Sequence, residues 1–168
     1  MHVAARGGRQ LASTRTGAAL QLPPEDWRLL RMSHPNVLLT GCLAAATSTL
    51  DDLRSCFRPP VVTWCAGTPL ILPPAAASRT LILNEAASLS VEDQLRLLAW
   101  LQRSDGTTQV ITTTSCPLFP LVERGAFLEG LYDYLSAVCL DVVSSDAPQR
   151  SRGPGDRLTR DDRVMLSR

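Results

Sequence analysis

Residues 41–49, G-C-L-A-A-A-T-S-T, come close to a phosphate-binding loop without completing one. Such a loop, G-x-x-x-x-G-K-[ST], needs its second glycine for close backbone approach and its lysine for the β- and γ-phosphates. Ala46 and Thr47 occupy those two places, and all seventeen basic side chains of the chain are arginines. The segment has the frame of a nucleotide site but lacks the groups that hold phosphate.

Two interpretations of this segment follow. Backbone N–H groups at a helix N-terminus can bind an anion without any lysine. Alternatively, Gly41–Thr49 is only the turn between a strand and a helix. Each lost charge-assisted hydrogen bond is worth about 1.5–3 kcal/mol, so losing several weakens ATP binding by orders of magnitude. This favours the simple turn.

The surrounding pattern predicts the elements that position this segment. Short apolar runs at 36–40, 61–64, 80–83, 109–113 and 137–142 predict strands. Helices are predicted at 25–32, 43–57, 90–101, 117–124 and 127–135, and the Pro-, Gly- and Ala-rich residues 66–79 are predicted to be a loop. Alternating strands and helices predict a three-layer α/β domain with a mainly parallel sheet. Gly41, Asn84, Glu85 and Ser115 would then meet at one edge of it.

Composition limits the alternatives. The 168 residues suit one domain at 23–143, with a flexible N-terminus at 1–22 and a disordered, charged tail at 144–168. A net charge of +1 gives no reason to expect a nucleic-acid or membrane partner. Five cysteines without C-x-x-C spacing indicate buried thiols in a reducing cytoplasm, and two histidines are too few for a metal site. The acid-free N-terminus is compatible with a transit peptide, but a flexible bacterial N-terminus is favoured.

Four segments, taken in order, carry a family resemblance. They are H-P-N-V-L-L-T-G at 34–41, R-T-L-I-L-N-E-A-A-S-L-S at 79–90, Q-V-I-T-T-T-S at 109–115 and G-A-F-L-E-G-L-Y-D-Y-L-S at 125–136. Together they resemble the AAA+ core of sigma-54-dependent transcription activators, over about residues 33–142. The resemblance implies a P-loop NTPase-like fold. It also places Ser48 and Thr49 where that family has its magnesium-binding hydroxyl, Glu85 at its water-polarising glutamate, and Ser115 at its sensor asparagine.

The departures from the family pattern bear on activity. Asn84 stands where the family has the aspartate of Walker B, and Leu128 and Tyr134 stand where it carries two trans-acting arginines. Where its effect has been quantified, an arginine finger is worth about 10³–10⁵ in rate. Fast ATP hydrolysis is therefore not expected. Glu85 is a vestigial catalytic candidate, and a polar strand end left from ancestry is favoured over a retained base.

The resemblance also implies parts that this sequence lacks. Residues 66–79 contain no G-A-F-T-G-A loop, with which the activators grip the sigma factor. No helical lid and no helix-turn-helix follow, so direct DNA binding is not expected. The sequence thus predicts a catalytically silent AAA+ module that binds a protein partner, either an intact AAA+ activator or a second copy. The alternative is a weak ATP-binding protein or slow ATPase, with ATP and Mg²⁺ bound weakly at Gly41, Ser48, Thr49, Asn84 and Ser115.

Overall fold

A parallel six-stranded sheet forms the centre of the computed structural model, which describes residues 8–11, 14–16, 19–74, 79–104 and 106–142. All its neighbouring strands are parallel. The spatial order of the strands is β1 (Arg9–Gln10), β8 (Val138–Val142), β4 (Val37–Gly41), β7 (Thr108–Thr114), β6 (Arg79–Asn84) and β5 (Val61–Cys65). Parallel strands need crossover connections, and the helices lie in these connections.

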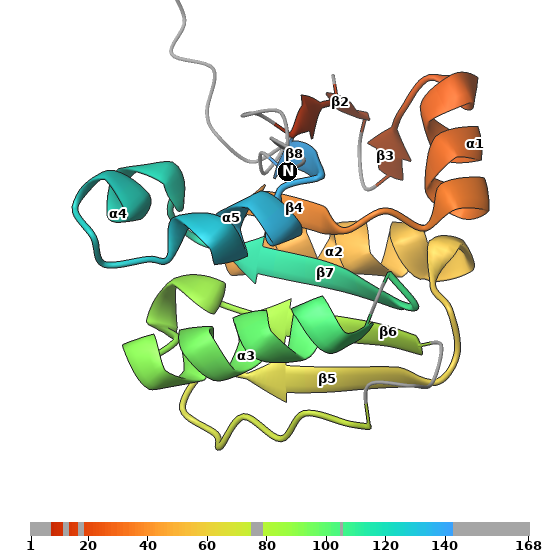
Figure 1. Cartoon of the computed structure of the whole chain (residues 1–168). Helices are drawn as coiled ribbons and strands as arrows, with labels where there is room; N and C mark the ends of the chain where they lie inside the picture. Colours follow the sequence, from red (N-terminus) through yellow and green to blue (C-terminus); the bar gives the residue numbers. More distant parts are fainter. Residues whose placement is uncertain (1–7, 12–13, 17–18, 75–78, 105, 143–168) are drawn as a thin grey trace, which may run out of the picture.

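Helices cover the two faces of this sheet (Figure 1). One face carries α3 (Val91–Ser104), α4 (Phe119–Glu123) and α5 (Glu129–Leu135), and the other carries α1 (Pro24–Ser33) and α2 (Leu43–Asp52). Two short 3-10 turns, η1 (Leu53–Cys56) and η2 (Ala86–Ser88), follow α2 and β6. The predicted three-layer α/β architecture with a mainly parallel sheet is confirmed.

A separate apolar core fills each face. Strand residues alternate between the two cores, as β6 illustrates: Leu81 and Leu83 pack toward α3, while Ile82 packs toward α2. Trp100 and Leu97 anchor α3 in the first core, and Leu30 anchors α1 in the second. No helix of the described part of the chain is long and apolar enough to cross a membrane.

The start of α3 follows from its sequence. Ser90 precedes the helix, and its Oγ accepts a hydrogen bond from the backbone N–H of Asp93 at 3.1 Å. The same hydroxyl donates to Asp93 Oδ2 at 2.9 Å. The Ser90 hydroxyl therefore caps the helix and satisfies an N–H group that the helix itself leaves unpaired.

The N-terminal residues contain structure that the sequence does not predict. No element is expected in residues 1–22, yet β1 adds to the sheet edge beside β8, and β2 (Thr14–Thr16) pairs with β3 (Ala19–Gln21). Leu11 and Leu20 are buried in the α1–α2 core. Strands of two or three residues carry no readable periodicity, which explains the omission. The predicted tail at 144–168 lies outside the described residues.

Two connections differ in how well the sequence anticipates them. The predicted helix at 43–57 is α2 followed by the tighter turn η1, so the α-helix ends at Asp52. Asp52 there accepts a hydrogen bond from the backbone N–H of Leu20 at 2.8 Å. Between β5 and β6, described residues 66–74 form neither helix nor strand, as the sequence predicts. This connection packs Leu70 against the α3 side of the sheet.

Candidate functional site

The carboxyl ends of β4, β6 and β7 bring part of the predicted site together. Glu85 directly follows β6, with a left-handed backbone (φ 59°, ψ 59°). Both of its carboxylate oxygens accept from the backbone N–H of Ser115 at 3.1 Å, and Oε1 also accepts from the Ser115 hydroxyl at 3.0 Å. Its backbone N–H donates to Thr113 Oγ1 at 3.2 Å. The Glu85 carboxylate therefore joins the end of β6 to the end of β7.

Asn84 makes contacts to both neighbouring strands. Its Nδ2 lies 3.5 Å from Cys65 Sγ on β5, and its Oδ1 accepts from the Thr113 hydroxyl at 3.4 Å. The side chain is half-buried. A neutral amide here provides no charge for a divalent cation. The described residues contain no group of three or more His, Cys, Asp or Glu side chains that could hold a metal ion.

The segment between β4 and α2 is a direct turn rather than a loop. Strand β4 ends at Gly41, Cys42 is the N-cap residue, and α2 begins at Leu43. The backbone N–H of Ala46 donates to the carbonyl of Cys42 at 2.9 Å, a helical i to i−4 bond. Residues that would surround a phosphate in a P-loop are already the first turns of a helix.

Gly41 has a packing reason to be glycine. It pairs with Val142 at the end of β8. A Cβ atom at Gly41 would lie 2.0 Å from the backbone oxygen of Val142, a separation that no real Cβ contact shows. The glycine is therefore needed for the close approach of β4 to β8, whatever else it does.

The two candidate hydroxyls lie inside α2. Thr49 is fully buried, and its hydroxyl donates to the carbonyl of Ala45 at 2.8 Å. Ser48 is half-buried on the same helix. Thr47, which stands in the lysine place, donates its hydroxyl to the carbonyl of Leu43 at 2.9 Å. Ala45 and Ala46 pack against Val142.

A cavity of about 580 Å³ lies beside this site, between α2 and the β5–β6 side of the sheet. Thr47 and Asn84 line one part of it, and Phe57, Val61 and Ile82 make much of it apolar. Its one basic lining residue, Arg54, is ion-paired with Asp51 at 3.0 Å. Asp51 also lines the cavity and offsets the charge of Arg54, so the described lining residues offer a phosphate group no net positive charge.

The two arginine-finger positions differ in exposure. Leu128 is partly buried and packs against the α3-side core, whereas Tyr134 is 41% exposed. Gln94 of α3, to which the sequence analysis assigns no role, is 1% exposed and links these segments. Its Nε2 donates to the carbonyls of Leu89 (3.0 Å) and Ala126 (3.2 Å), and its Oε1 accepts from the N–H of Leu128 (2.9 Å). The signal in the sequence that could have identified Gln94 is a polar residue on the buried face of a helix.

The cysteines correct a sequence-based expectation. Cys56 is buried and Cys139 half-buried, but Cys42, Cys65 and Cys116 are exposed. All three exposed thiols lie at the carboxyl ends of strands, where a parallel sheet leaves its edge open. Burial and, secondarily, the nearby Asp141 charge raise the pKa of the Cys139 thiol above its usual value, which lowers its reactivity.

Comparison with known proteins gives the family. Residues 52–144 match the family described as the Sigma-54 interaction domain, and the Gly41–Thr49 segment lies before the matched region. No curated protein sequence matches the chain significantly.

Solved structures agree on the fold. NtrX from Brucella abortus in complex with ATP has a TM-score of 0.54 at 23% identity, covering 69% of this chain and 34% of NtrX. Its complex with ADP has a TM-score of 0.55 at 21% identity, covering 78% of this chain and 37% of NtrX. The chain thus spans about a third of the NtrX chains it resembles. Since the family match extends over more than half of its residues, this chain belongs to the Sigma-54 interaction domain family.

Proposed function

We propose that this chain is a catalytically silent AAA+ module that acts in transcription regulation by binding a protein partner. The observation that carries the proposal is the start of α2 at Leu43, with only Cys42 between it and the end of β4. A phosphate-binding loop holds its ligand with successive backbone N–H groups and a lysine. Here Ala46 and Thr47 are helical, and the chain has no lysine.

The remaining polar groups of the site support the same interpretation. A general base needs a free carboxylate within reach of the water it polarises. The Glu85 carboxylate instead accepts three hydrogen bonds from Ser115. We interpret Glu85 as a link between strands, with a structural rather than a catalytic role.

The proposed partner is another protein with the same AAA+ architecture, either an intact sigma-54 activator or a second copy of this chain, in the bacterial cytoplasm. The family description, Sigma-54 interaction domain, supports a protein partner in general, and the choice of an AAA+ protein is our proposal. A module that keeps the scaffold can occupy a subunit position beside an intact partner. Co-purification of the chain with an activator from the same host, measured by size-exclusion chromatography with light scattering, tests this part.

Measuring ATP binding is the most direct test of whether the nucleotide site is inactive. A ligand present at a hundred times its Kd stabilises a folded protein by about 2.7 kcal/mol. Millimolar ATP with Mg²⁺ is expected to leave the Tm of this chain unchanged, because no loop and no lysine hold the phosphates. Saturable binding with a micromolar Kd, measured by calorimetry, would establish the alternative function, a weak ATP-binding protein or slow ATPase.

A restored variant serves as the control for that test. The triple substitution Ala46→Gly, Thr47→Lys and Asn84→Asp returns the missing groups of the family pattern. We expect it to bind ATP–Mg²⁺ more tightly than the natural chain, because the glycine weakens the first turns of α2 and the charges return. A folded triple variant with no gain in affinity would contradict this account of the site.

A further inference from the structure

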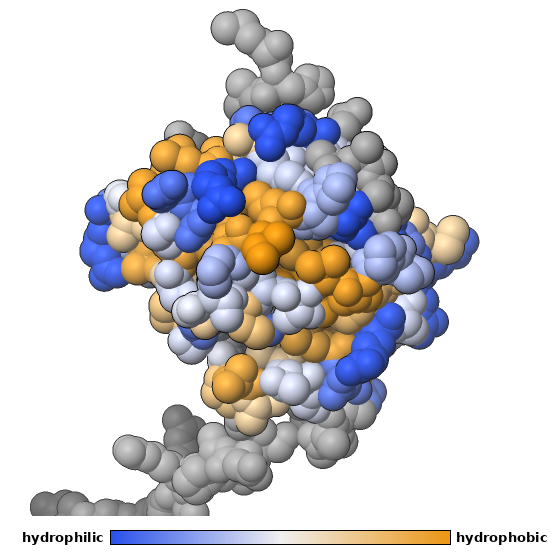
Figure 2. Space-filling view, turned by 90° about the horizontal axis from the view of Figure 1, so that it is seen from below, coloured by the Kyte–Doolittle hydropathy of each residue, from blue (hydrophilic) through white to orange (hydrophobic). Residues whose placement is uncertain are grey.

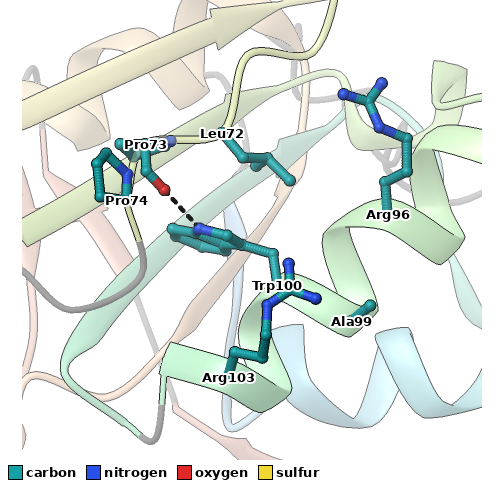
Figure 3. A pocket seen from close by; sticks show the side chains of 7 residues that line it. All are labelled: Leu72, Pro73, Pro74, Arg96, Ala99, Trp100 and Arg103. Carbon is teal, nitrogen blue, oxygen red and sulfur yellow. Dashed lines mark hydrogen bonds between the residues drawn. The ribbon is translucent and has the colours of Figure 1, made fainter.

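A second cavity, which we call the α3 groove, lies away from the nucleotide-like edge (Figure 3). Its volume is about 580 Å³. One wall is formed by residues 72–74 of the β5–β6 connection and the other by one face of α3. The lining residues are Leu72, Pro73, Pro74, Arg96, Ala99, Trp100 and Arg103.

Two hydrogen bonds from α3 hold the opposite wall in place. The indole Nε1 of Trp100 donates to the carbonyl of Pro73 at 2.6 Å, drawn as the dashed line in Figure 3. Arg96 Nη2 donates to the carbonyl of Leu70 at 3.3 Å. Trp100 is 3% exposed and Leu70 is 2% exposed, so both anchors are part of the core. The groove is therefore preformed, which lowers the entropy cost of binding.

Two arginines give the groove its charge. Arg96, Ala99, Trp100 and Arg103 follow the spacing i, i+3, i+4, i+7, which places them on one face of α3. Arg96 and Arg103 are two turns apart, or about 10.5 Å along the axis. Arg96 pairs with Asp93 through Nη1 at 3.1 Å, and no ion pair is found for Arg103 within the described residues. Among the described residues that line the groove, none is acidic.

The surroundings of the groove favour a protein over a small anion. Ile71, beside the groove on the β5–β6 connection, is 78% exposed, and Leu95 on α3 is 53% exposed. The face of the molecule on the β5 side carries broad apolar surface bordered by hydrophilic residues (Figure 2). An apolar centre with a charged rim is the usual composition of a protein interface.

We propose that the α3 groove binds an extended acidic segment of a protein partner. An extended polyproline II segment has three residues per turn and rises about 3.1 Å per residue, so carboxylates three residues apart lie on the same side of it, about 9.3 Å apart, close to the separation of the two arginines. The two residues between them place an apolar side chain over Ala99 and Leu72. This inference names the chemistry of the partner and rests on the interaction function proposed above.

The test uses a fluorescein-labelled peptide with a central Glu-Leu-Ala-Glu segment and a second peptide with Gln-Leu-Ala-Gln. Fluorescence anisotropy with the whole chain is expected to give saturable binding of the acidic peptide and at least tenfold weaker binding of the amide peptide. The double variant Arg96→Gln, Arg103→Gln is expected to weaken the acidic peptide about tenfold, because exposed ion pairs each contribute modestly.

A matched control variant distinguishes binding in the α3 groove from nonspecific attraction between the acidic peptide and other arginines of the chain. Arg28 and Arg31 lie on α1, beside Trp27, and Arg31 packs over the Trp27 ring at 5.5 Å. The variant Arg28→Gln, Arg31→Gln removes the same charge from a similar surface and is expected to keep full peptide affinity. Arg103→Glu alone provides a second test, because no described contact depends on Arg103.

The outcomes distinguish this inference from the proposed function. The groove proposal is overturned if the two peptides bind equally well, or if the α1 and α3 variants lose equal affinity for the acidic peptide. Neither result bears on the proposal that the nucleotide site is inactive. Binding of ATP–Mg²⁺ together with arginine-dependent peptide binding overturns the silent role but supports the groove. Loss of acidic-peptide binding in folded Arg103→Glu, with unchanged Tm, supports the inference directly.

Discussion

At the scale of single residues, polar side chains at the edge of the sheet link neighbouring strands. Glu85 bonds to Ser115, and Asn84 contacts Cys65 and Thr113. Gln94 does the same inside the fold, where it satisfies three backbone groups of two neighbouring segments. A buried polar group left without its partner costs about 1–3 kcal/mol. Gln94 therefore has a structural role that does not depend on nucleotide.

We expect Gln94→Ala to lower the free energy of unfolding by about 1–3 kcal/mol, since it leaves the Leu128 N–H and two carbonyls unpaired. Urea unfolding followed by circular dichroism measures this change. Gln102→Ala, on an exposed position of the same helix, is the control and should stay within about 0.5 kcal/mol. Equal losses in the two variants would contradict the linking role of Gln94.

At the scale of elements, the position at which α2 begins determines whether residues 43–48 form a helix or a loop. Alanine is the strongest helix former, and residues 44–46 are three alanines without an interrupting glycine. The helix can therefore begin as soon as β4 ends. Its first turns are held by packing as well, because Ala45 and Ala46 contact Val142.

The stability of the variant Ala46→Gly tests whether this segment is helical in solution. Ala46→Gly is expected to destabilise the chain by about 1–2 kcal/mol, through helix propensity and the loss of a buried methyl group. The same substitution at Ala66, exposed after β5, should cost less than about 0.5 kcal/mol. Thermal unfolding of both variants gives the comparison, and a neutral Ala46→Gly would argue that residues 43–48 form a loop in solution.

Much of the arrangement of elements was predictable because the strands are buried apolar runs and the helices carry clear signals, such as the Ser90 cap. The sequence also predicted that Gly41, Glu85 and Ser115 follow strands that end at one edge. It could not predict the α3 groove, because that depends on where residues 70–74 lie against Trp100. The strands β1 to β3 are too short for periodicity to identify.

At the scale of the whole molecule, three of the five thiols gather on one edge of the sheet. Cys42, Cys65 and Cys116 are exposed there, whereas Cys56 is buried on the α1–α2 side. Cysteine side chains are usually buried. These three are exposed because few side chains cover this edge of the sheet. We therefore expect thiol reagents to label the native chain unevenly.

Native titration with a coloured thiol reagent near pH 8 is expected to modify Cys42, Cys65 and Cys116 rapidly. Cys56 should react only after unfolding, because its side chain is buried. Cys139 should react slowly, since its raised pKa reduces the thiolate fraction at that pH. Peptide mass spectrometry identifies the modified sites. Rapid labelling of Cys56 in the folded chain would contradict this arrangement.

Only Cys42 separates the end of β4 from the start of α2, and this has a consequence for engineering the segment. Ala46→Gly alone weakens the helix without adding a cation, and Thr47→Lys alone adds a charge to a segment that stays helical. Neither single substitution is expected to create a phosphate site, so a nucleotide-binding variant of this chain needs both changes together.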